Sequence, residues 1–115
     1  MEKIIKNITV GEVLRFADQV DYLKGQIVSK TLAQNDAVSL TLFAFDKGEE
    51  ISTHASGGDA LVVLLDGKGQ ITIDDQISHL LAGESILMPA GHPHAVYAPE
   101  RFKMLLIVVF PKKTA

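Results

Sequence analysis

The sequence contains no cysteine. Disulfides, thiolate zinc sites and a cysteine nucleophile are therefore excluded. Any metal ion would have to be bound by imidazole, carboxylate, hydroxyl or water, and these donors suit iron, nickel, zinc or manganese better than copper(I). Long apolar stretches are also missing. The two longest, 60–65 and 104–110, are far shorter than the roughly 20 residues that a transmembrane helix needs.

A stripe of basic residues is absent as well. The chain has 11 Lys and Arg against 14 Asp and Glu, which gives a formal charge of -3. Nucleic-acid binding, in which basic residues displace counterions from phosphate, is not indicated. The first ten residues contain lysines and an asparagine where a signal peptide would have an apolar core. We therefore expect a cytoplasmic protein that binds neither nucleic acid nor membrane.

Short apolar stretches, separated roughly every 8–12 residues by Gly, Pro or Asp, indicate β-strands. Helix is expected only as a marginal turn over 11–17. The predicted strands are 26–33, 38–45, 49–54, 60–65, 70–73, 76–80, 85–88, 95–97 and 102–110. Strands this short bury their apolar faces only against a second sheet. The pattern therefore predicts an all-β antiparallel sandwich or barrel.

Two of these strands, within 60–65 and 104–110, are apolar on both faces. In a small antiparallel barrel the outer face is normally polar, so an apolar outer face implies a second covering surface. For a chain of 115 residues we expect a second copy of the chain, in a two-fold homodimer. Within the single domain we expect an N-terminal arm with the first strand (1–34), a barrel core (35–110) and a tail (111–115).

The four histidines are the candidates for chemistry, because imidazole is the commonest neutral metal ligand. His54 and Ser56 share one face of an extended segment, since strand side chains repeat every two residues. His92 and His94 would share a face in the same way. His79 lies beside a core position, so alternation directs it outward, and we interpret it as a surface or interface histidine.

Two stretches of the chain contain glycine and histidine at fixed spacings. The first stretch contains Gly48, His54, Ser56, Ala60 and Gly67. Five, one, three and six residues, respectively, separate each of these from the next. In the second, Gly83 is followed after five residues by Pro89-Ala-Gly91 and after two more by His94. With these spacings, which match the two cupin motifs, the chain resembles a small single-domain cupin of the cupin-2 type over about residues 35–110.

The resemblance implies a double-stranded β-helix, or jelly-roll barrel, that is usually dimeric and binds a metal ion through three histidines and a glutamate. His54 matches the first histidine and His94 the last. Ser56 stands in place of the second histidine and Ala60 in place of the glutamate. Half of the usual ligands are therefore absent. We predict a weak or incomplete site for a divalent ion (Fe, Ni, Zn or Mn), with Ser56, Asp59 and His92 as candidate additional ligands.

Two functions remain open at this stage. In one, His54 and His94 hold a divalent ion that polarises a small oxygenated metabolite, and the resemblance then implies dioxygenase- or isomerase-like chemistry. In the other, a metal-poor barrel without catalytic activity binds a small molecule or has an accessory role, with the histidines as hydrogen-bond partners. The sequence favours neither and identifies no catalytic residue.

Overall fold

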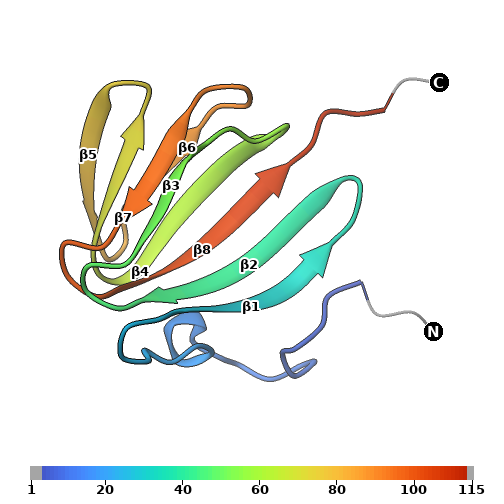
Figure 1. The fold of residues 1–115 in the computed structure, drawn as a ribbon. Helices are drawn as coiled ribbons and strands as arrows, with labels where there is room; N and C mark the ends of the chain where they lie inside the picture. Colours follow the sequence, from blue (N-terminus) through green and yellow to red (C-terminus); the bar gives the residue numbers. More distant parts are fainter. Residues whose placement is uncertain (1–3, 114–115) are drawn as a thin grey trace.

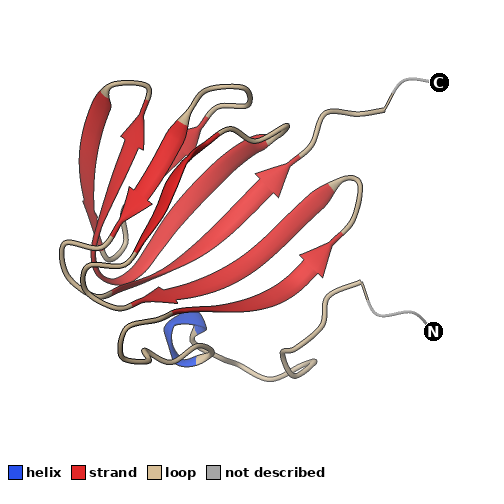
Figure 2. Ribbon diagram, viewed as in Figure 1, coloured by secondary structure: helices blue, strands red, loops and turns tan. Residues whose placement is uncertain are grey.

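The computed structural model describes residues 4–113, and nearly all regular structure in this range is β-strand (Figures 1 and 2). A short 3₁₀ helix, η1 (Phe16–Asp18), precedes the strands. The strands are β1 (Ile27–Gln34), β2 (Val38–Phe45), β3 (Glu50–His54), β4 (Asp59–Ile73), β5 (Gln76–Leu81), β6 (Ser85–Met88), β7 (His94–Tyr97) and β8 (Phe102–Val109). The all-β prediction is confirmed, whereas the helical turn expected over 11–17 is a 3₁₀ turn shifted toward β1. Across residues 4–113, no helix is both long and apolar enough to span a membrane.

Strand β4 is shared between two antiparallel sheets. Its first half pairs with β8 on one side and β6 on the other, and its second half pairs with β5 and β7. The strand orders are β1-β2-β8-β4-β6 in one sheet and β5-β4-β7-β3 in the other. Figure 1 shows the two sheets as one curled surface that bends along β4. This arrangement is the predicted double-stranded β-helix.

The sequence predicts that a strand ends at Gly67, but β4 continues through it. The pairing with β8 shifts between Leu64 and Asp66, which marks a β-bulge. Gly67 has a φ of +79°, and a Cβ there would lie 1.9 Å from the carbonyl oxygen of Arg101. Only glycine permits this approach of the chain before β8. The glycine therefore bends the strand from one sheet into the other instead of ending it.

The barrel interior is apolar. Alternate residues of β4, namely Ala60, Val62 and Leu64, are at most 1% exposed and belong to the main core cluster. In the same cluster Phe45 stacks on Phe102, with ring centroids 4.5 Å apart. Because strand side chains alternate, the intervening residues of β4 face the outside of the barrel.

The N-terminal segment, residues 4–22, covers part of that outer face and runs beside β1 in Figure 1. Phe16 and Val20 pack with Leu42 and Leu105 in a second apolar cluster. The sequence predicts that a second copy of the chain covers the apolar outer face. The structure shows that the chain itself covers part of this face. Residues 1–3 of the predicted arm and 114–115 of the predicted tail lie outside the described residues.

Tyr22 fastens the N-terminal segment to the sheet. Its hydroxyl donates a hydrogen bond to the Asp66 carboxylate at 2.6 Å. Its ring contacts the Arg101 guanidinium and the Lys103 ammonium, 4.5 and 4.8 Å from the centroid. Burial and the hydrogen bond to Asp66 raise the pKa of Tyr22 far above its usual value. The phenol therefore stays protonated and remains a donor.

Candidate functional site

A cavity of about 340 Å³ is lined by residues from both sheets. Its lining includes Met88 of β6 and Met104 of β8, and all but three of its lining residues are apolar. The three polar ones are His54, Ser56 and His94. The structure therefore brings together the two histidines of the paired motifs and the serine that shares a face with one of them.

His54 ends β3 and His94 begins β7, and the two are direct partners across this strand pair. Side chains of such partners lie about 5 Å apart at Cβ, so the pairing register alone makes them neighbours. Their Nε2 atoms are 3.1 Å apart, and the rings meet edge to face at 76°.

A backbone contact determines where the ring proton of His54 lies. Nδ1 of His54 is 3.0 Å from the carbonyl oxygen of Ser52, which only accepts hydrogen bonds, so Nδ1 carries a proton. Nε2 of His54 then faces Nε2 of His94 across the strand pair. Ser52 contributes through its backbone carbonyl, which leaves no signal in the sequence.

His94 is only 3% exposed, whereas His54 is exposed. Nδ1 of His94 is buried without a hydrogen-bond partner among the described residues. Burial lowers the pKa of His94, and the proximity of His54 lowers it further, while the backbone of His92 acts in the opposite direction. His94 is thus held in its neutral form.

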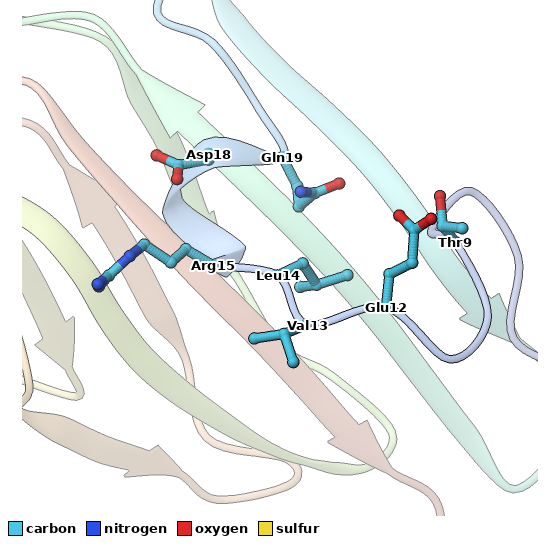
Figure 3. A pocket seen from close by; sticks show the side chains of 7 residues that line it. All are labelled: Thr9, Glu12, Val13, Leu14, Arg15, Asp18 and Gln19. Atoms are coloured by element: carbon cyan, nitrogen blue, oxygen red, sulfur yellow. The ribbon is translucent and has the colours of Figure 1, made fainter.

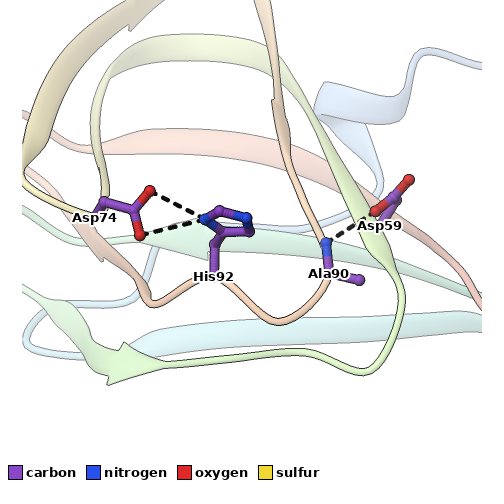
Figure 4. A network of polar contacts seen from close by, with 4 residues as sticks. All are labelled: Asp59, Asp74, Ala90 and His92. Atoms are coloured by element: carbon purple, nitrogen blue, oxygen red, sulfur yellow. Dashed lines mark hydrogen bonds and ion pairs between the residues drawn. The ribbon is translucent and has the colours of Figure 1, made fainter.

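The loops that carry the two motifs are tied to each other beside the cavity. The Gly91 N–H donates to the Ser56 carbonyl at 2.9 Å, and the Ala90 N–H donates to the Asp59 carboxylate at 2.8 Å (Figure 4). The Ser56 hydroxyl in turn accepts from the Gly58 N–H at 3.1 Å. These contacts fix the loop that follows His54 against the loop that precedes His94.

The other predicted ligands lie elsewhere. His92 is exposed and its Nδ1 contacts the Asp74 carboxylate at 3.0 Å, as Figure 4 shows. Neither His92 nor Asp59 lines the cavity. His79 is exposed and contacts Gln70 at 3.0 Å, in the outward position that strand alternation predicts. The structure therefore brings His54, Ser56 and His94 together and places His92 and Asp59 apart from them.

The donors in the cavity fall short of a complete metal site. Catalytic zinc sites normally supply three protein ligands, and here the cavity offers two imidazoles and a neutral hydroxyl. Among residues 4–113, no group of three or more His, Cys, Asp or Glu side chains could hold a metal ion. Ala60, in the place of the expected glutamate, is buried and offers only a methyl group. The set fits hydrogen bonding better than tight metal retention, and metal binding by His54 and His94 stays a prediction.

A second concavity, of about 410 Å³, lies on the N-terminal segment (Figure 3). Its lining comes entirely from residues 9–19, and most of these side chains are exposed. One surface loop forms all of its walls, in contrast to the barrel cavity, which both sheets enclose. We therefore place the candidate site in the barrel.

Two curled antiparallel sheets with a histidine pair in an apolar cavity define a cupin-type barrel. The Cupin domain family matches residues 41–110, and the chain belongs to this family. It is similar to a conserved protein of unknown function from Streptococcus pyogenes. The two sequences are 44% identical, and the structures match with a TM-score of 0.94 over 97% of this chain and 98% of that one. A cupin superfamily protein from Desulfitobacterium hafniense is 36% identical, with a TM-score of 0.89 over 93% of this chain and 98% of that one. None of the curated proteins matches the chain.

Proposed function

We propose that the barrel cavity binds a small, largely apolar molecule that forms hydrogen bonds with His54 and His94. The observation that supports this is the composition of the cavity, in which two imidazoles and one hydroxyl interrupt an apolar lining. Small-molecule sites typically combine apolar walls with a few convergent polar groups. The volume of about 340 Å³ lies at the small end of the range for such sites, so the ligand is small.

A thermal-shift screen with a broad metabolite panel tests this proposal. We expect at least one compound to raise the unfolding temperature, with an equal shift in the presence of a chelator. Ala60→Leu, which fills part of the cavity, should abolish that shift, whereas Ala90→Leu at an exposed position away from the cavity should preserve it. A panel with no active compound, or a shift unaffected by Ala60→Leu, would contradict the proposal.

A weakly bound divalent ion is the second candidate. Two nitrogen ligands that bind one ion at about 2.0–2.1 Å lie roughly 3.0–3.4 Å apart, and the Nε2 atoms of His54 and His94 are 3.1 Å apart. Such an ion would act as a Lewis acid toward a small oxygenated molecule. Elemental analysis after addition of Fe, Ni, Zn or Mn should find metal in the native chain and in a His79→Ala control, and lose it in His54→Ala. A native chain that retains no metal would rule this candidate out.

We also propose that the protein forms a homodimer through the part of the outer face that the N-terminal segment leaves uncovered. Leu61 of β4 pairs with Leu87 of β6 on one side and Ile107 of β8 on the other. These three residues form an outer row, and Leu87 is 52% exposed. A second copy that packs on this row would remove its apolar surface from water.

A further inference from the structure

A row of three aromatic rings runs from the core to the wall of the barrel cavity. Phe102 of β8 and Phe45 of β2 are fully buried and stack with their ring centroids 4.5 Å apart and their planes 11° apart. Phe43 lies on the same face of β2 as Phe45, with its centroid 6.0 Å away and its ring tilted by 45°. Unlike the two inner rings, Phe43 is only half-buried, and it lines the cavity. The row therefore stops at the cavity with a ring that the protein itself leaves partly uncovered.

Two methionines line the same space as this last ring. Met104 of β8 is the cross-strand partner of Phe43, and Met88 comes from β6. Both methionines are at most 2% exposed and belong to the main core cluster, so the surrounding side chains hold them beside the cavity. A thioether sulfur makes favourable contacts with aromatic rings, often at the ring edge. The cavity therefore offers one aromatic face and two sulfur atoms to whatever occupies it.

These three side chains indicate the class of ligand. We propose, on the basis of the ligand-binding function above, that the ligand carries an uncharged aromatic ring and that Phe43 selects it. The ring packs on Phe43 in a tilted or offset geometry and contacts the sulfur atoms of Met88 and Met104. Because aromatic rings have a negative face and a positive edge, such pairs are more stable than their buried area alone predicts. A saturated ring gains the buried area but not this additional stabilisation.

The rest of the lining restricts the ligand further. Within the described lining there is no Lys, Arg, Asp or Glu, so no side chain of opposite charge would compensate a charged ring. Ile51 and Val96 of the second sheet add apolar surface. The volume is comparable to that of about eleven water molecules at roughly 30 Å³ each, which leaves room for one ring with a short polar substituent. His54, Ser56 and His94 are the polar side chains of the lining, and they bind that substituent.

The test compares two probes that differ only in the saturation of the ring. 2-Phenylethanol and 2-cyclohexylethanol are titrated calorimetrically into the full chain. Both carry the same hydroxyl group, and the cyclohexyl ring buries at least as much apolar surface, so hydrophobic burial alone predicts equal or tighter binding of the saturated compound. We expect 2-phenylethanol to bind at least about fivefold more tightly, because the aromatic pair and the sulfur contacts add to burial.

Two matched substitutions and a spectroscopic signal locate the ring. Phe43→Leu keeps an apolar side chain but removes the ring, and it should lower the preference for 2-phenylethanol at least about twofold. Phe16→Leu makes the same change at a half-buried phenylalanine of the second apolar cluster, outside the cavity, and should leave the preference unchanged. In NMR spectra an aromatic ring shifts the signals of methyl groups beside it. 2-Phenylethanol should therefore shift the methyl signals of Met88 and Met104 more than 2-cyclohexylethanol does.

The outcomes separate the aromatic assignment from the ligand-binding function. If 2-cyclohexylethanol binds as tightly as 2-phenylethanol, the assignment is overturned and the ligand-binding function stands. A preference that Phe43→Leu leaves unchanged, or that Phe16→Leu lowers equally, would overturn the role of Phe43. Methyl signals of Met88 and Met104 that respond equally to both probes would overturn the placement of the ring. Failure of both probes to bind also overturns the assignment, and the metabolite panel with Ala60→Leu then decides the ligand-binding function separately.

Discussion

His94 is a buried polar residue in an apolar wall. Its Nδ1 has no hydrogen-bond partner among residues 4–113, and an unsatisfied buried polar group costs about 1–3 kcal/mol of folding free energy. Apolar residues at this position would avoid that cost. A histidine that is held neutral, with its other nitrogen directed at His54, is therefore better explained by binding than by stability.

The lowered pKa of His94 makes stability depend on pH. Because the folded-state pKa lies below the unfolded value of about 6.5, the unfolded chain binds the proton more readily between the two values. The free energy of unfolding should therefore be highest above pH 6.5, decrease as the pH falls through the folded-state pKa, and level off below it. Urea unfolding across this range measures the effect.

The control for this prediction is a pair of matched substitutions. His94→Gln should remove the part of the pH dependence that His94 contributes, whereas His79→Gln, at an exposed histidine, should retain it. A native chain whose stability rises as the pH falls below 6.5 would contradict the assigned direction of the pKa shift.

At the scale of elements, the N-terminal segment is a structural part of the barrel wall. The Lys6 N–H donates to the Leu32 carbonyl at 2.8 Å, and the Asn7 side chain donates to the Thr31 carbonyl at 2.8 Å, so the segment adds hydrogen bonds along the edge of β1. Val20 is 4% exposed and belongs to the second apolar cluster. A sheet edge that is covered in this way is also protected from pairing with other chains.

Two valines of this segment provide a matched test of its contribution. Val20→Ala removes two buried methyl groups and should lower the free energy of unfolding by about 2 kcal/mol. Val13→Ala makes the same chemical change at a fully exposed position and should alter it by less than about 0.5 kcal/mol. Chemical denaturation of both variants measures the difference. Equal effects would mean that the segment does not stabilise the barrel.

At the scale of the whole molecule, the outer row of Leu61, Leu87 and Ile107 is the surface that one chain leaves incompletely covered. Ile107 packs against the second apolar cluster, to which the N-terminal segment contributes Val20, but Leu61 and Leu87 belong to neither cluster. β6 is an edge strand of its sheet, so nothing in the strand order prevents the approach of a second copy from that side.

Sedimentation at micromolar concentration tests the homodimer. We expect the native chain to sediment as a dimer and Leu87→Asp to sediment as a monomer, because the charge would be buried in the proposed interface. Ile77→Asp places the same charge on an exposed apolar residue of β5, outside the outer row, and should leave the dimer intact. A native chain that sediments as a monomer would contradict the proposal.

Local patterns in the sequence were sufficient for most of the strands and for one pair of histidines, but not for the continuity of β4 through Gly67. Apolar alternation and turn residues act over a few positions, so they predict strands such as β2 without knowledge of their partners. The spacing of glycine and histidine predicted that His54 and His94 belong to one site, and the register of β3 on β7 places them in contact. The family match over residues 41–110 agrees with the predicted cupin barrel.

Only the tertiary structure decided those features that depend on contacts between residues distant in the sequence. Gly67 could end a strand or bend it, and the approach of Arg101 determines that it bends. His92 and His94, around the start of β7, have the same local signal, yet Asp74 holds His92 outside while the pairing with His54 turns His94 into the cavity. By itself, the sequence therefore determined the barrel and predicted the two histidines that meet in its cavity. Which side chains face the cavity was decided only by packing between distant strands, since hydrogen bonds and burial depend on distance in space.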